Sequence, residues 1–381
     1  MKRSDPSPSN DRGAAWEVGG PVRIAAVATA SPPNEWTQDD VCDVLAQHFD
    51  FYRSRAVRRM FTNSGVETRR FCFGRGDFDP NATVDAFHAL FRRAAPELAG
   101  EAARKALELA GVAPEEIGLV VAATCTGYLC PGVSAYLTRS LGLADSVQRA
   151  DLVGMGCAGA LPALQRGFDY VSSARQRKAL VVAVEVCSAC WFVDDTLETV
   201  VGNAICADGA ASVVLEPAQG QVPARACASE SSEQRGPRPS ILGFESAIET
   251  EWMAAVGLEN RAGRHRIVLS KELRTAAGPA VARVVGRLLE RYALRKDDIA
   301  HWVFHAGGAA VLDNIDEHMG FCEEDLRASR AVFRRFGNMS SPTALFVLDE
   351  IQTQRRPAPG DLGVALALGP GLATEAALLR W

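Results

Sequence analysis

The pattern of hydrophobic positions predicts buried strands that alternate with helices. Residues 97–110 have the composition of a helix, which Gly111 would end, and residues 276–291 form a second helical segment. Continuous apolar runs of strand length are typical of strands covered on both faces. Such runs occupy residues 23–30, 117–124, 179–186, 210–215, 300–304 and 363–368. The order of these segments predicts an α/β fold.

Two stretches of the chain resemble each other. LELAGVAPEEIGLVVAA at 107–123 and LERYALRKDDIAHWVFH at 289–305 both run helix, turn, acidic pair, isoleucine and strand. The later strands follow in the same order in both parts. This predicts two duplicated α/β halves, although a chance match of one helix–strand unit is the simpler alternative. The halves are placed at 22–240 and 241–381, after a polar, disordered tail at 1–21, and the first half ends in a polar loop at 216–240.

Composition narrows the class of protein. The chain has 381 residues with 41 basic and 46 acidic side chains, a net charge of -5, so no basic field is available for nucleic acid. Its apolar runs are too short to span a bilayer, and the first residues lack the apolar core of a secretory signal. We therefore expect a cytoplasmic protein whose ten cysteines do not form a disulfide framework.

Six of the ten cysteines fall between residues 125 and 206, and one of them has the surroundings of a nucleophile. Cys157 stands in GMGCAGAL, residues 154–161, before a helical run at 161–172. Glycines allow a sharp turn that exposes the sulfur, and a helix N-terminus favours the thiolate. The alternative is a cysteine buried where small residues pack closely.

Two further motifs carry candidate catalytic groups. His305 begins HAGG at the end of a predicted strand, where ligand crevices of α/β proteins lie. Asn338 stands in GNMSSP and can donate its amide to a developing oxyanion. A lone histidine is otherwise a core residue, and an asparagine in such a loop otherwise makes a turn.

The remaining cysteines allow other interpretations. Cys187 and Cys190 have the spacing of a redox dithiol or of half a zinc site, but no second pair completes the latter. Packing or pocket lining is the default for a buried cysteine. We therefore predict no metal site.

Together the motifs resemble the type III polyketide synthases, the chalcone synthase superfamily of thiolase-fold condensing enzymes. The family's Cys-His-Asn triad corresponds to Cys157, His305 and Asn338. The resemblance extends from about residue 22 to the C-terminus and includes CTGYLCPG at 125–132, VGNAICADG at 201–209 and GPG at 369–371. It implies a layered αβαβα thiolase fold, no cofactor, malonyl-CoA and an acyl-CoA starter as substrates, and a homodimer.

The resemblance also implies two groups of binding residues. The substrate pocket corresponds to Cys125, Thr126, Cys130, Cys190, Trp191, Cys206, Ile267 and Ser340. The CoA entrance corresponds to Arg55, Arg58, Arg59, Gly307 and Gly308, although a solvated basic face is an equal alternative for the arginines. Cys130 matches a position near the partner subunit.

This chain departs from the plant enzymes of the family. Cys206 replaces one phenylalanine gatekeeper, and the second falls near Ile267 or Val268. Cys190 replaces a cavity threonine, and Asn63 replaces a lysine of the CoA entrance. These changes predict a pocket of different shape. DLVGMGC and DIAHW resemble the bacterial dihydroxyphenylacetyl-CoA synthase branch, and HAGG followed by AVLD is similar to the tetrahydroxynaphthalene synthases.

The prediction is thus an acyltransferase that condenses malonyl-CoA onto an acyl-Cys157 thioester with loss of carbon dioxide, and cyclises the product to an aromatic or pyrone. Alternatives are a ketoacyl-ACP synthase III-like enzyme that elongates once, a non-catalytic thiolase-fold partner subunit, and a redox or zinc protein. The sequence does not specify the starter or the number of extensions.

Overall fold

A computed structural model describes residues 21–173, 177–218, 236–261, 263–270 and 272–381. Residues 1–20 of the predicted tail and most of the predicted loop at 216–240 therefore lie outside the described residues. The strands are β1 (Val22–Ala30), β2 (Asn34–Thr37), β3 (Thr68–Phe71), β4 (Ile117–Ala123), β5 (Gln148–Leu152), β6 (Lys178–Val186), β7 (Asp208–Pro217), β8 (Ser240–Ile248), β9 (Val256–Arg261), β10 (Arg264–Leu269), β11 (His301–Phe304), β12 (Leu362–Gly369) and β13 (Ala373–Arg380).

Ten α-helices connect or flank these strands in the described part of the chain. They are α1 (Gln38–His48), α2 (Arg55–Thr62), α3 (Val84–Ala110), α4 (Val133–Leu141), α5 (Ala160–Ser172), α6 (Leu197–Ile205), α7 (Leu273–Arg291), α8 (Ala309–Met319), α9 (Glu323–Phe336) and α10 (Thr343–Glu350). The predicted helix at 97–110 is the second half of α3. The Thr83 side chain caps its start, and Gly111, at φ 65°, ends it as predicted.

The main sheet has nine strands in the order β11-β12-β13-β8-β1-β7-β6-β4-β5. β4 and β11 are completely buried, which explains their unbroken apolar sequences. A short β1–β8 pairing, in which Val22 faces Ile241 and Arg23 faces Ser240, joins the two parts of the sheet. The small sheets β2–β3 and β9–β10 lie outside it.

The duplication predicted from the sequence is confirmed by the sheet topology. In the first half β4 pairs parallel with β6, and β6 pairs antiparallel with β7. In the second half β11 pairs parallel with β12, and β12 pairs antiparallel with β13. β5 is an addition at the edge of the first half. The exact boundary between the halves along the chain stays a prediction.

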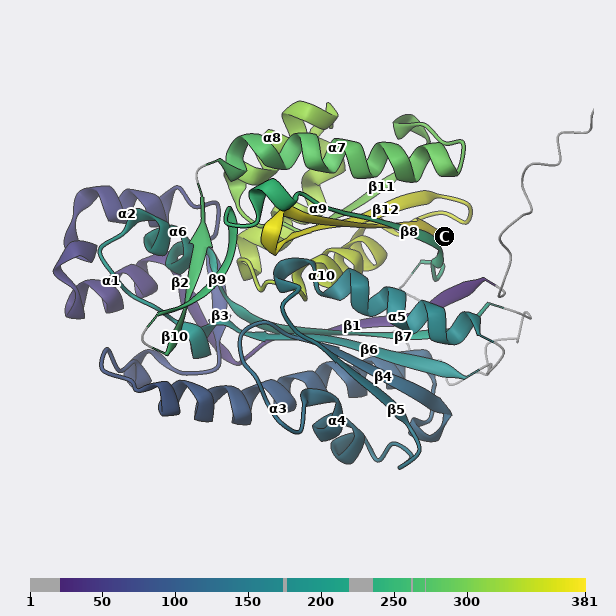
Figure 1. Cartoon of the computed structure of the whole chain (residues 1–381), viewed down its shortest axis with the longest axis horizontal. Coiled ribbons are helices and arrows are strands. Elements are labelled where there is room, and N and C mark those ends of the chain that lie inside the picture. The colour runs from purple at the N-terminus through teal and green to yellow at the C-terminus, as the bar shows by residue number, and fades with distance from the viewer. Residues whose placement is uncertain (1–20, 174–176, 219–235, 262, 271) are drawn as a thin grey trace, which may run out of the picture.

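The two halves stack as five layers (Figure 1). Helices α3 and α4 cover the outer face of the first half, and α7 and α8 cover that of the second, while α5 and α10 lie between the two halves of the sheet. The αβαβα thiolase architecture predicted from the resemblance is thus confirmed. The central hydrophobic cluster combines residues of both halves, such as Leu161 of α5, Leu345 of α10 and Val303 of β11. In the described residues no helix is long and apolar enough to cross a bilayer.

Helix packing predicts opposite effects for two helical glycines, one in the central layer and one in an outer layer. A Cβ on Gly167 of α5 would lie 2.7 Å from Leu215 Cδ1 and 2.9 Å from Val181 Cγ2, whereas a Cβ on Gly286 of α7 would meet nothing within 4 Å. Gly167→Ala should therefore destabilise the fold by about 1–3 kcal/mol through overpacking. Gly286→Ala, the matched control, should stabilise it by up to about 1 kcal/mol through helix propensity. Urea unfolding measures both, and changes of the same sign would contradict this packing.

Candidate active site

Cys157 lies in a tight turn where β5 leads into α5. The turn is the 3₁₀ segment η4 (Gly156–Ala158), and Gly156 has φ 51°. Cys157 is half-buried, and the side chains of Ser340 and Asn338 are close enough to its thiol to interact with it. Burial raises the pKa of the thiol to about 12, and these two side chains only partly offset that effect. The expected thiolate at the helix N-terminus is therefore replaced by a neutral thiol in the resting site.

His305 follows β11 directly and is buried. Its backbone N–H donates to Leu366 O at 2.8 Å, which fixes the end of the strand. In the described structure neither ring nitrogen has a hydrogen-bond partner. Burial lowers the pKa of His305 to about 4. The imidazole is thus neutral at physiological pH and has lone-pair capacity available to accept a proton.

Asn338 is held at both its backbone and its amide. Its N–H donates to Ile205 O at 2.7 Å, and its carbonyl accepts from Ala207 N at 2.9 Å. The side-chain Oδ1 accepts from Ser340 N at 2.7 Å, and Nδ2 donates to Gly307 O at 3.2 Å. One Nδ2 hydrogen is left for the Cys157 sulfur or for a ligand.

The three predicted catalytic residues converge on one cavity of about 640 Å³. They come from the start of α5, the end of β11 and the loop before α10, far apart in the sequence. Apolar side chains from α6 and β10, including Val201, Ile205 and Leu269, form much of its wall, and Gly307 and Gly308 also line it. A thiol, an imidazole and an amide donor in a mostly apolar chamber can perform acyl transfer.

None of the eight predicted pocket residues is among those that line this cavity. Cys125 Sγ lies 3.4 Å from Ser340 Oγ, and the same side chain lowers the pKa of Cys157, so one hydroxyl lies near two sulfurs. Ser340 has φ 60°. Cys206 is half-buried beside Asn338, and Ile267 faces Gly202 of α6.

Three other predicted pocket residues lie elsewhere. Trp191 is stacked on Phe71 at 5.1 Å in an aromatic cluster with Trp36 and is not part of the cavity lining. Cys190 is buried, and its thiol donates to Cys187 O at 3.3 Å. Cys130 is exposed on the surface.

Thr126 is hydrogen-bonded to Glu185 of β6, a residue that the sequence analysis did not identify. This carboxylate is buried and accepts hydrogen bonds from Cys125 N at 3.0 Å, from Thr126 N at 3.1 Å and from Ser341 Oγ at 2.6 Å. Burial raises the pKa of Glu185. One glutamate inside the apolar run ALVVAVEV was the signal that could have revealed it.

The arginines predicted at the entrance differ in their surroundings. Arg59 of α2 lines the cavity, next to Asn63 and Ser64. Arg58 is ion-paired with Asp43 at 2.6 Å and lies 3.8 Å from Asp39. Arg55 is exposed and is not part of the cavity lining.

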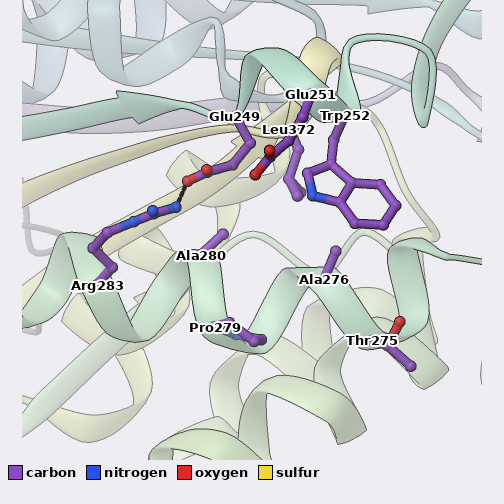
Figure 2. Close-up of a pocket in the computed structure, with 9 residues that line it drawn as sticks. All are labelled: Glu249, Glu251, Trp252, Thr275, Ala276, Pro279, Ala280, Arg283 and Leu372. Carbon is purple, nitrogen blue, oxygen red and sulfur yellow. Dashed lines mark ion pairs between the residues drawn. The ribbon is translucent and has the colours of Figure 1, made fainter.

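A second cavity, of about 370 Å³, lies between α7 and the turn that follows β8 (Figure 2). Glu249 and Arg283 form an ion pair across it, and Trp252 projects toward α7. None of its nine lining residues is a cysteine, a histidine or a predicted site residue. In the described residues no group of three His, Cys, Asp or Glu side chains could hold a metal ion.

Known proteins resemble this chain along most of its length. The chain matches the N-terminal domain of chalcone and stilbene synthases over residues 10–218 and their C-terminal domain over residues 260–381. A 3,5-dihydroxyphenylacetyl-CoA synthase of Streptomyces toyocaensis is 32% identical over 364 residues, 94% of this chain and 90% of the relative. A 1,3,6,8-tetrahydroxynaphthalene synthase of Streptomyces peucetius is 30% identical over 366 residues, 94% and 93% of the two chains. The crystal structure of PKS-I from the brown alga Ectocarpus siliculosus superposes with a TM-score of 0.85 at 27% identity, covering 95% of this chain and 98% of the other.

The turn that carries Cys157 predicts a difference between two neighbouring glycines. Both have positive φ, but a Cβ on Gly156 would lie 2.4 Å from Pro370 Cδ, whereas one on Gly154 would meet nothing within 4 Å. Gly154→Ala should cost about 1 kcal/mol of backbone strain. Gly156→Ala should add a displacement of Cys157 and slow its alkylation by about tenfold or more relative to Gly154→Ala. Peptide-resolved mass spectrometry measures these rates, and equal rates in the two variants would contradict the packing.

Proposed function

Since the chain belongs to the chalcone and stilbene synthase family and is a type III polyketide synthase, we propose that Cys157, His305 and Asn338 carry out its decarboxylative condensation. The single observation that supports this assignment best is their convergence on one cavity. The substrates would be malonyl-CoA and an acyl-CoA starter, with no cofactor. The product would be an aromatic or pyrone polyketide, as the names of the dihydroxyphenylacetyl-CoA and tetrahydroxynaphthalene synthases suggest for the aromatic case.

Loading of the starter begins with a neutral Cys157 thiol and a neutral His305 imidazole. His305 takes the proton of the Cys157 thiol, and the sulfur attacks the carbonyl carbon of the starter thioester. The CoA sulfur leaves with the proton from His305, and the acyl group stays on Cys157 as a thioester. Burial disfavours each charge separately, but proton transfer creates opposite charges together, and their attraction is strong in a cavity of low polarity.

Extension requires stabilisation of an enolate. Malonyl-CoA loses carbon dioxide, and the negative charge develops on the thioester oxygen, which needs donors oriented in advance. Nδ2 of Asn338 can donate there because Ser340 N and Gly307 O hold the amide in one orientation. The enolate carbon then attacks the acyl-Cys157 carbonyl, which lengthens the chain by two carbons and frees the Cys157 sulfur.

The cavity wall would set chain length and ring closure. The chamber holds about 640 Å³, and its wall near the triad is built from small or aliphatic side chains such as Ala204 and Val201. Cys206 takes the place of an aromatic gatekeeper in the plant enzymes, and it lies next to Asn338. We infer that these substitutions leave room for a growing chain beside the thioester.

We also propose that the protein acts as a homodimer. β5 is one of the two edge strands of the main sheet, and its residues are exposed or half-buried. Tyr128 and Val153, which follow the parallel strands β4 and β5, are 69% and 55% exposed. A dimer in which this edge is covered would bury them together with Cys130. Light scattering on the purified protein gives the oligomeric state.

The function is tested by incubating the purified enzyme with malonyl-CoA alone and with candidate starters. Mass spectrometry should detect extended, cyclised products and free CoA. Asn338→Ala should lose decarboxylation of malonyl-CoA by about a hundredfold, the cost of one oxyanion donor. An Asn338→Ala enzyme that decarboxylates malonyl-CoA at the wild-type rate would refute the oxyanion role. Faster reaction with acyl-carrier thioesters than with CoA thioesters would favour the single-round alternative.

The role of His305 predicts a pH dependence for alkylation of Cys157. In His305→Gln no base accepts the thiol proton at neutral pH, and burial keeps the thiol pKa near 12. The alkylation rate of that variant should rise about tenfold per pH unit from pH 7 to 10. In the wild type the rate should be higher at pH 7 and change less. Since His305 protonates only near pH 4, wild-type activity should persist below pH 6. Identical pH profiles would contradict the assignment.

The different surroundings of the three arginines predict that their replacement by alanine weakens CoA binding unequally. Arg59→Ala should raise KM for malonyl-CoA about tenfold, because it removes a cation from the cavity mouth. Arg58→Ala should change KM less than about twofold, since its guanidinium is already engaged by Asp43 and Asp39. Arg55→Ala is the matched control. A larger effect of Arg58→Ala than of Arg59→Ala would show that the phosphates bind on the other face of α2.

A further inference from the structure

Two cysteines outside the catalytic triad lie together at the junction of β6, α6 and β7. Cys187 directly follows β6, and Cys206 lies between α6 and β7. The antiparallel register pairs Val186 with Asp208, so Cys187 and Cys206 lie one and two residues beyond neighbouring strand ends. The two thiols are close enough to interact directly, and both residues are half-buried.

A buried cation stands beside this pair. Arg69 of β3 is 0% exposed. Its Nη1 donates to Asn203 O at 2.7 Å and to Cys206 O at 2.9 Å, its Nη2 donates to Gln38 Oε1, and its Nε has no hydrogen-bond partner in the described structure. All of these acceptors are neutral. The guanidinium also lies over the rings of Phe61 and Phe71, at 6.0 and 5.6 Å from their centroids, and the groups whose negative charge would stabilise it further are the Cys206 and Cys187 sulfurs.

The two sulfurs are not equivalent. The hydrogen bond from Cys187 and the charge of Arg69 lower the pKa of Cys206, whereas the same hydrogen bond and burial raise the pKa of Cys187. This is the arrangement of a nucleophilic sulfur with a resolving thiol in contact. Cys190, the neighbour of Cys187 in the CxxC spacing, does not compete, because its thiol donates to the Cys187 carbonyl.

We propose that Cys187 and Cys206 form a peroxide-sensitive dithiol in which Cys206 is the attacking sulfur and Cys187 the resolving one. The Cys206 thiolate attacks one oxygen of hydrogen peroxide, the O–O bond breaks and hydroxide leaves, which gives a sulfenic acid. The Cys187 thiol then attacks that sulfur, an S–S bond forms and water leaves. The two thiols lose two electrons, and the peroxide, with a proton from solvent for the hydroxide, becomes two waters.

The disulfide would act on the neighbouring catalytic loop. Asn338 donates its N–H to Ile205 O and accepts from Ala207 N, so the two residues that flank Cys206 hold the backbone of Asn338. A disulfide draws the sulfurs to about 2.0 Å, well inside hydrogen-bonding distance, which must move this segment. It also removes the negative charge beside Arg69. Oxidation should therefore lower activity reversibly, an effect that rests on the function proposed for Asn338.

The test treats the reduced full-length enzyme with about one equivalent of hydrogen peroxide and maps its peptides without reduction. The expected result is a cross-linked peptide pair containing Cys187 and Cys206, an intact mass lower by about 2 Da, and reversal by dithiothreitol. The same cross-link should form in Cys157→Ala, which makes this readout independent of catalysis. Cys190→Ser, the matched control, should still form it, and Cys206→Ser should not.

Activity is the second readout. Peroxide should lower wild-type turnover at least about threefold with recovery in dithiothreitol, and Cys187→Ser should lose that recoverable component. A cross-link that forms without an effect on turnover would overturn the link to Asn338. Cross-links of Cys187 to Cys190, or Cys206 that stays reduced while other cysteines oxidise, would overturn the dithiol itself.

Discussion

The active site depends on the close contact of two turns, one from each half of the molecule. The turn that carries Cys157 packs against the GPG turn at the end of β12, where a Cβ on Gly156 would lie 2.4 Å from Pro370 Cδ and one on Gly369 would lie 2.7 Å from Ala158 Cβ. This contact brings the start of α5 to the inner edge of the second half, where His305 follows β11. The layered stacking of the two halves therefore determines whether the triad is assembled at all.

Burial, a consequence of that stacking, then determines the chemistry. It raises the pKa of Cys157 and lowers the pKa of His305, so the resting pair is neutral and proton transfer waits for a substrate. Because the resting pair carries no charge, hydrogen bonds hold the surrounding residues in position. Ser340 fixes the amide of Asn338, and Glu185 fixes the segment of Cys125 and Thr126 beside Ser340. A buried carboxylate that accepts several hydrogen bonds restricts the positions of its donors, because the loss of any donor leaves an acceptor unsatisfied.

The sequence was sufficient for the features that local chemistry encodes. Apolar runs identified β4, β6 and β12, and the repeat at 107–123 and 289–305 identified the two halves. Motifs at Cys157, His305 and Asn338 indicated residues that the fold brings to one cavity. Local sequence could not show that Arg58 is engaged by Asp43 from α1, or that Trp191 packs against Phe71, since both contacts join segments whose proximity only the tertiary structure creates. The contact that we propose between Cys187 and Cys206 is of the same kind.

The central claim, that Cys157 carries the growing chain, is tested most directly by trapping the acyl-enzyme. The enzyme is mixed with an accepted acyl-CoA starter, quenched in acid and mapped by peptide mass spectrometry. The account predicts one acyl group per chain, on the peptide that contains Cys157, and no loading of Cys157→Ala. An acyl group on Cys125 or Cys206 in the wild type, or undiminished loading of Cys157→Ala, would contradict it.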